Sequence, residues 1–154
     1  MLKKMKKAFT ITELVIVIAV IAILAAVLIP TFTTVVNKAN ESAAMQEARS
    51  EFENFNVEAL TSESDVRNFV IKYQKGDSAD VYYFVVTDGQ FSTTPVKLDA
   101  DTPADSVSQI KVGGVTYTQL GDSTAEKPTG FNEFNDYKEL NENVTIYVAP
   151  AQGE

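Results

Sequence analysis

The sequence predicts an α+β protein in which a long N-terminal helix packs on a small antiparallel sheet. Two observations support this prediction. Residues 9–60 repeat apolar side chains at helical spacing, whereas later parts of the 154-residue chain hold short β-branched and aromatic runs separated by turn residues. A chain of this length has room for one modest domain beside a membrane segment.

The start of the predicted helix has the properties of a membrane segment. An uninterrupted apolar run extends from Leu14 to Ile29 and stops at Pro30. Counted from Phe9, this segment has about the 20 residues that a helix needs to cross a bilayer. The four lysines of residues 1–8 predict a cytoplasmic N-terminus. An ordinary secretory signal peptide is the alternative, but its apolar run is usually about 7–15 residues and its cleavage site better defined.

One carboxylate, Glu13, lies at the edge of the apolar run. A charge at the edge of a membrane-length segment is costly unless it has a partner, so Glu13 is a candidate functional residue. The alternative is an accidental interfacial carboxylate that lipid headgroups solvate.

The helical pattern resumes after the proline. Apolar residues recur at steps of mostly three or four from Phe32 to Ala59, and charged residues, Glu51 among them, are assigned to the other faces. Proline in a helix interior bends the axis. The sequence therefore predicts a long, kinked helix from about Phe9 to about Leu60, whose second half packs under a head domain.

The head is predicted to hold one short helix and several strands. Gly113-Gly114 gives the strongest hairpin signal, because a two-residue primed turn needs positive φ. The expected elements are a helix from Asp65 to about Tyr73 after an N-cap at Ser64, and strands at Val81–Val86, Gln90–Val96, Ser106–Val112, Val115–Leu120 and Asn143–Ala149.

The whole chain thus divides into four expected parts. They are a basic leader at residues 1–8, a transmembrane or assembly helix at 9–30, an amphipathic helix half at 31–60, and an acidic globular head at 61–154. Residues 9–154 carry 9 basic and 21 acidic side chains, a balance that disfavours binding to nucleic acid.

The composition excludes several kinds of catalytic site. The chain has no cysteine and no histidine, so it has no disulfide, no thiolate nucleophile and no Ser-His-Asp triad. No G-x-G-x-x-G or P-loop pattern is present. We therefore expect a protein that is not an enzyme and that needs no cofactor.

Three aspartates in one loop are candidate ligands for calcium. Asp99, Asp101 and Asp105 lie in the stretch LDADTPAD, and calcium takes six to eight oxygen ligands, often from such loops. The EF-hand pattern is absent, because no glycine stands at the turn position. A solvated loop is the favoured interpretation, and the three aspartates are kept as a weak calcium candidate.

The segment KKAFTITELVIVIAVIAILAAVLIP resembles the N-terminus of type IV pilins and the related pseudopilins. Those precursors have a short basic leader, a small residue, a phenylalanine, a glutamate four residues later, and an apolar helix that ends at a proline. Phe9, Glu13 and Pro30 stand in that register, over about a sixth of the chain. Ala8 replaces the usual glycine, and Ala22 stands where many relatives have a glycine that loosens the helix.

The resemblance implies a pilin-like fold and a processing site. A prepilin peptidase would cut between Ala8 and Phe9 and methylate the new amine of Phe9. Phe9, Glu13 and Pro30 would then act in assembly. The Glu13 carboxylate would pair with an N-terminal amine, either its own or a neighbour's, and so set the register between helices.

The function that the resemblance implies is that of a structural subunit of a type IV pilus-like filament, serving adhesion, motility, DNA uptake or secretion. The partners would be further copies in a helical filament, the prepilin peptidase, the membrane, and an assembly platform with its ATPase. The precursor would lie in the cytoplasmic membrane and the filament on the cell surface. A pseudopilin of a type II secretion or competence system is one alternative, and a monomeric, membrane-anchored extracellular binding module is another.

Overall fold

The computed structural model describes residues 9–61, 66–102, 108–120 and 141–149. The chain divides into two compact units, Met1–Asn40 and Glu41–Glu154, and each is described by itself. The predicted cleavage residue Ala8 and the aspartate Asp105 lie outside the described residues.

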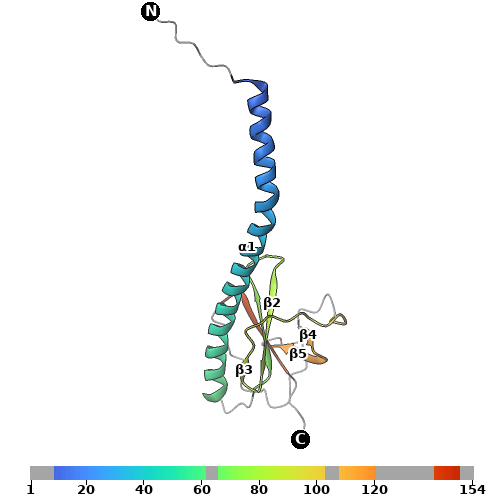
Figure 1. Ribbon diagram of the computed structural model, residues 1–154. Helices are drawn as coiled ribbons and strands as arrows, with labels where there is room; N and C mark the ends of the chain where they lie inside the picture. The colour runs from blue at the N-terminus through green and yellow to red at the C-terminus, as the bar shows by residue number, and fades with distance from the viewer. Residues whose placement is uncertain (1–8, 62–65, 103–107, 121–140, 150–154) are drawn as a thin grey trace, which may run out of the picture. The chain divides into compact units, whose positions relative to one another are not determined.

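One helix, α1 (Ile11–Thr61), accounts for the helical part of the prediction (Figure 1). It continues through Pro30, which has no N–H and so leaves the carbonyl of Ala26 without its usual helical donor. The degree of bending at this proline stays a prediction.

Three threonines after the proline satisfy their hydroxyls within α1. The Thr31 hydroxyl donates to the Val27 carbonyl (3.1 Å). The hydroxyls of Thr33 and Thr34 both donate to the Pro30 carbonyl, at 2.9 and 3.0 Å. Because these polar atoms are turned onto the backbone, the apolar character of the helix surface continues past the proline.

The head is a six-stranded antiparallel sheet with the order β3-β2-β1-β6-β5-β4. The fold-class prediction, a long N-terminal helix packed on a small antiparallel sheet, is therefore confirmed. The strands are β1 (Phe69–Gln74), β2 (Val81–Thr87), β3 (Gln90–Phe91), β4 (Gln109–Val112), β5 (Val115–Gln119) and β6 (Val144–Val148).

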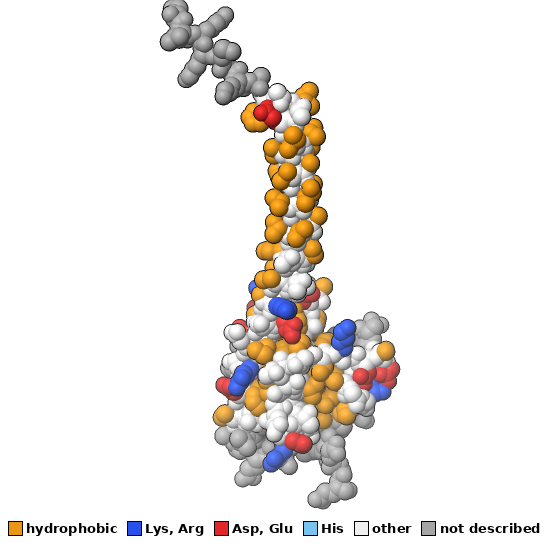
Figure 2. Space-filling model, in the orientation of Figure 1, with side chains coloured by type: hydrophobic (Ala, Val, Ile, Leu, Met, Phe, Trp, Pro, Cys, Tyr) orange, Lys and Arg blue, Asp and Glu red, His pale blue; other side chains and the backbone are white. Residues whose placement is uncertain are grey.

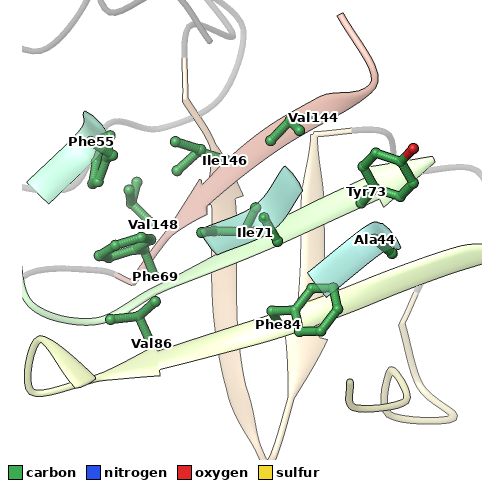
Figure 3. Close-up of a cluster of buried hydrophobic side chains, with 11 residues drawn as sticks. Ala44, Phe55, Phe69, Ile71, Tyr73, Phe84, Val86, Val144, Ile146 and Val148 are labelled. Atoms are coloured by element: carbon green, nitrogen blue, oxygen red, sulfur yellow. The ribbon is translucent and has the colours of Figure 1, made fainter. Parts of the chain in front are cut away.

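The C-terminal part of α1 packs on one face of the sheet. Phe55 lies against Phe69, with ring centroids 4.6 Å apart, and both side chains are fully buried. Burying a side chain of this size contributes about 1.5–3 kcal/mol. The buried residues of this core, most of them labelled in Figure 3, are Ala44, Ala48, Phe55, Phe69, Ile71, Tyr73, Phe84, Val86, Val144, Ile146 and Val148.

The opposite face of the sheet carries a second, smaller core. Its buried members are Val70, Ile110, Tyr117 and Tyr147, and Leu98 packs against them from outside the sheet. Tyr147 is paired with Val70 across β6 and β1. Both faces of the central strands are therefore covered.

The predicted helix from Asp65 to Tyr73 is wrong over its described part, because Phe69–Gln74 is strand β1. The spacing of Val66, Phe69 and Val70 also suits a helix face, which misled the prediction. In the structure Phe69 and Val70 point to opposite faces, and β1 pairs with β2 on one side and β6 on the other. Tertiary pairing on both sides outweighs the local helical pattern.

Two further predictions need correction. The return strand Gln90–Val96 is shorter, since β3 ends at Phe91 and Val96 forms an isolated bridge with Tyr83. Glu51, assigned to a polar face of the helix, is buried at 1% exposure. It continues the stripe of Ala44, Ala48 and Phe55 at steps of three and four residues.

Candidate functional site

The first turn of α1 is closed by two side chains, those of Thr10 and Glu13. The backbone N–H of Thr10 donates to Glu13 Oε2 (3.0 Å), and the backbone N–H of Glu13 donates to Thr10 Oγ1 (3.3 Å). The Thr10 hydroxyl also donates to Glu13 Oε2 (2.8 Å). This reciprocal pattern is a capping box, and it satisfies two amides that the start of a helix leaves without partners.

The capping box gives Glu13 a role within its own helix. Its carboxylate lies near the N-terminal end of α1, where the helix dipole favours negative charge. The side chain is exposed, so it remains accessible to a further partner. The sequence analysis missed this role, although Thr10 and Glu13 stand at the T-x-x-E spacing that signals a capping box.

Phe9 directly precedes the capping threonine and is 81% exposed. Phe9 thus lies two residues before Ile11, the first residue of α1. Pro30, the third predicted assembly residue, is exposed and lies inside the helix. Phe9 and Glu13 therefore stand together at the helix start, whereas Pro30 is separated from them along it.

The helix from Ile11 to Val36 exposes its large apolar side chains (Figure 2). An exposed apolar surface of this extent marks a site of membrane or protein contact. Among the described residues one helix is long and apolar enough to cross a membrane, a property that signal sequences share. The exposed side chains are Ile11, Leu14, Val15, Ile16, Val17, Ile18, Val20, Ile21, Ile23, Leu24, Val27, Leu28, Ile29, Phe32, Val35 and Val36.

The two described aspartates of the calcium candidate are engaged by N–H donors. The Asp99 carboxylate accepts from the backbone N–H of Gly113 (3.1 Å) and of Gly114 (2.8 Å). Asp101 forms an ion pair with Lys111, whose hydrogen bond lowers the pKa of the Asp101 carboxyl. In the parts of the chain that the structure describes, no three acidic, histidine or cysteine side chains are grouped to hold a metal. Calcium binding stays a prediction.

Comparison with known proteins identifies the N-terminal segment. The family model described as prokaryotic N-terminal methylation motif matches residues 3–29. No curated protein and no solved structure shows a significant match. The matched segment contains the lysine-rich leader, Phe9, the capping residues Thr10 and Glu13, and most of the exposed apolar helix. Residues 3–29 are therefore a prepilin-type signal for cleavage and methylation, of the kind that type IV pilins and pseudopilins carry.

Proposed function

We propose that this protein is the precursor of a structural subunit of a type IV pilus-like filament. The observation that carries the proposal is the coincidence of the methylation motif with a helix whose apolar side chains are exposed from Ile11 to Val36. Such a surface is stable in lipid or against other apolar helices, and unstable in water. A subunit that passes from membrane to filament exchanges one of these environments for the other.

The motif at residues 3–29 supports the proposed processing step. A prepilin peptidase cuts between Ala8 and Phe9 and methylates the amine of Phe9. This cut removes the four leader lysines and leaves a positive N-terminal amine close to the Glu13 carboxylate. The precursor lies in the cytoplasmic membrane, and the cell supplies the assembly platform and its ATPase.

Assembly proceeds through α1, with Phe9, Glu13 and Pro30 at its interfaces and the acidic head outside. The Glu13 carboxylate pairs with the N-terminal amine of a neighbouring copy and fixes the axial register of the helices. The role is structural rather than enzymatic. A pseudopilin of a secretion or competence system shares these steps and differs in the length of the fibre. A monomeric membrane-anchored binding module would instead keep its leader.

Mass spectrometry of the N-terminus of protein taken from the producing cells tests the processing step. We expect a chain that begins with N-methylated Phe9. A chain that begins at Met1 would support the monomeric anchored module, and one that begins after Ala26 would identify a cleaved signal peptide. Either result would overturn the filament proposal.

The capping box permits a sharper test of Glu13. Glutamine at this position keeps an acceptor for the Thr10 amide but has no charge, so Glu13→Gln preserves the cap and removes the ion pair. Thr10→Val is the matched variant, since it removes the capping hydroxyl and keeps the carboxylate.

Filament yield by electron microscopy is the measurement for these two variants. We expect Glu13→Gln to abolish or strongly reduce filaments and Thr10→Val to leave them largely intact. The reverse result would show that Glu13 acts through its own helix, and the proposed pairing between subunits would be wrong.

A further inference from the structure

Residues 92–102, here called the strap, connect the two outer parts of the sheet. Near one edge, the Ser92 N–H donates to the Val85 carbonyl (2.9 Å) and the Val96 N–H donates to the Tyr83 carbonyl (2.8 Å), both acceptors belonging to β2. At the other edge, the Asp99 N–H donates to the carbonyl of Lys111 in β4 (2.8 Å). Because β4 ends the strand order and β2 is followed only by the two-residue β3, the strap reaches both edges (Figure 1).

Between these edges the strap crosses the face opposite α1. Leu98 packs on the second core, which contains Val70, Tyr117 and Tyr147. The strap is therefore held by apolar contact in its middle and by backbone hydrogen bonds at its ends.

The strap is fastened to Lys111 of β4 by the Thr102 hydroxyl and by the backbone N–H of Asp99. The backbone carbonyl and N–H of Lys111 are directed at the strap. The Thr102 hydroxyl donates to the Lys111 carbonyl (3.2 Å) and accepts from the Lys111 N–H (3.3 Å). The backbone N–H of Asp99 donates to the same carbonyl, so the backbone N–H and the carbonyl of Lys111 are both hydrogen-bonded to the strap. A strand-pairing partner at this residue would have to displace these bonds.

Asp99 also holds the turn of the β4–β5 hairpin. Gly113 and Gly114 have φ of 58° and 82°, as the primed turn requires, and lie between the paired residues Val112 and Val115. Their two N–H groups converge on the Asp99 carboxylate, one on each oxygen. Consecutive amides in such a turn form a small anion receptor, and here a carboxylate of the same chain fills it.

We infer that the strap closes the sheet against strand pairing with other copies of this chain, and that Asp99 is the residue that locks it. Unpaired edge strands are templates for association between chains. Where α1 holds several copies of this chain in one membrane or filament, the local concentration of heads is high. Association through unpaired edge strands then becomes more frequent. This protection acts in the membrane-bound chain and does not depend on filament formation.

Hydrogen exchange of the full-length protein in detergent micelles tests the lock. Asp99→Ala removes hydrogen bonds to a charged acceptor, so we expect the amides of Gly113 and Gly114 to exchange about tenfold faster or more. Asp101→Ala is the matched control, because it removes a neighbouring, exposed carboxylate of the strap, which pairs with the partly exposed Lys111 side chain. We expect less than about a twofold change at the same amides in that control.

Association measures the consequence of opening the strap. We expect Asp99→Ala micelles to accumulate assemblies of several chains, detected by analytical ultracentrifugation, with an increase in intermolecular β-sheet in the infrared spectrum. Unchanged exchange at Gly113 and Gly114 would show that Asp99 is not the lock. Faster exchange without association would show that the strap does not protect the edge.

A second variant covers the case in which Asp99→Ala fails to fold. Thr102→Val is nearly isosteric and removes only the hydroxyl that bonds Lys111. For Thr102→Val we expect faster exchange of the Lys111 amide and unchanged exchange at Gly113 and Gly114. A further variant, Asp99→Asn, keeps one of the two acceptor oxygens of Asp99. We expect Thr102→Val to associate less than Asp99→Asn. Unchanged exchange of Lys111 together with a monomeric Asp99→Asn chain would overturn the inference.

Discussion

The helix from Ile11 to Val36 and the sheet of the head use the same apolar residue types in opposite ways. In this N-terminal part of α1 the apolar side chains are exposed, Phe32 for example at 69%. Phe55, in the C-terminal part of α1, is fully buried against the sheet. The head therefore obtains its burial from its own strands and from the C-terminal part of α1. Among the described residues, the large apolar side chains of Ile11–Val36 are exposed, and lipid or another chain would supply the burial that they lack here.

Two phenylalanines of α1 offer the largest test of this contrast. Phe55→Ala removes a buried ring that packs on Phe69, and we expect the free energy of unfolding of the head to fall by about 3–5 kcal/mol. Phe32→Ala is the matched control in the same helix, and we expect a change within about 0.5 kcal/mol. Denaturant titration of the full chain in micelles, followed by aromatic circular dichroism, measures both. Equal losses in the two variants would break the comparison.

Alkaline pH gives a smaller effect that is confined to the head. Burial, with a contribution from Tyr83, raises the pKa of Tyr147 to about 12 from 10.0. Stability that depends on the neutral phenol is fully present below pH 10 and is lost as the pH rises towards 12. Two pKa units correspond to about 2.7 kcal/mol.

We therefore expect the free energy of unfolding to decline between pH 10 and 12, and to decline less steeply in Tyr147→Phe. Burial also raises the pKa of Tyr83 and Tyr117, so a residual slope should persist in the variant. Denaturant titrations at several pH values measure the slope. A decline of equal steepness in the variant would assign the alkaline sensitivity to other groups.

The smallest expected effect concerns the exposed pair of Asp101 and Lys111. The hydrogen bond from Lys111 lowers the pKa of Asp101, so the pair is formed above the ordinary pKa of an aspartate and is lost as the pH falls through the lowered value. Since both side chains are at the surface, we expect Asp101→Asn to leave the Tm unchanged at pH 7. A clear drop in Tm would show that surface charge contributes to the head in a way that its core does not explain.

The parts of the structure that could be predicted are those with a strong local signal. The apolar run before Pro30, the helical stripe after it and the Gly113-Gly114 hairpin each depend on neighbours in sequence. β1 could not be predicted in this way, because its identity depends on β2 and on β6, which lies about 70 residues further along the chain. The burial of Glu51 likewise depends on which face of α1 meets the sheet.

The candidate site shows the same division. The register of Phe9, Glu13 and Pro30 could be seen in the sequence, and so could the Thr10–Glu13 capping box, although it was overlooked. The roles of Asp99 and Asp101 could not, because their partners lie on a hairpin that follows about ten residues later. An acidic loop suggests cation binding only until the N–H groups that face it are known.

The threonines after Pro30 have a consequence for how the chain meets a bilayer. Because their hydroxyls are bonded to backbone carbonyls, the apolar surface extends over about 23 residues from Leu14 to Val36, or about 35 Å along a helix. A hydrocarbon layer is about 30 Å thick, so an upright helix would leave about one turn of apolar surface outside it. Hydrophobic mismatch of this size is relieved by tilt, by local thickening of the bilayer, or by association with another helix. In a bilayer, association with another apolar helix would therefore be one way to cover this surface, and the proposed filament would provide such a contact.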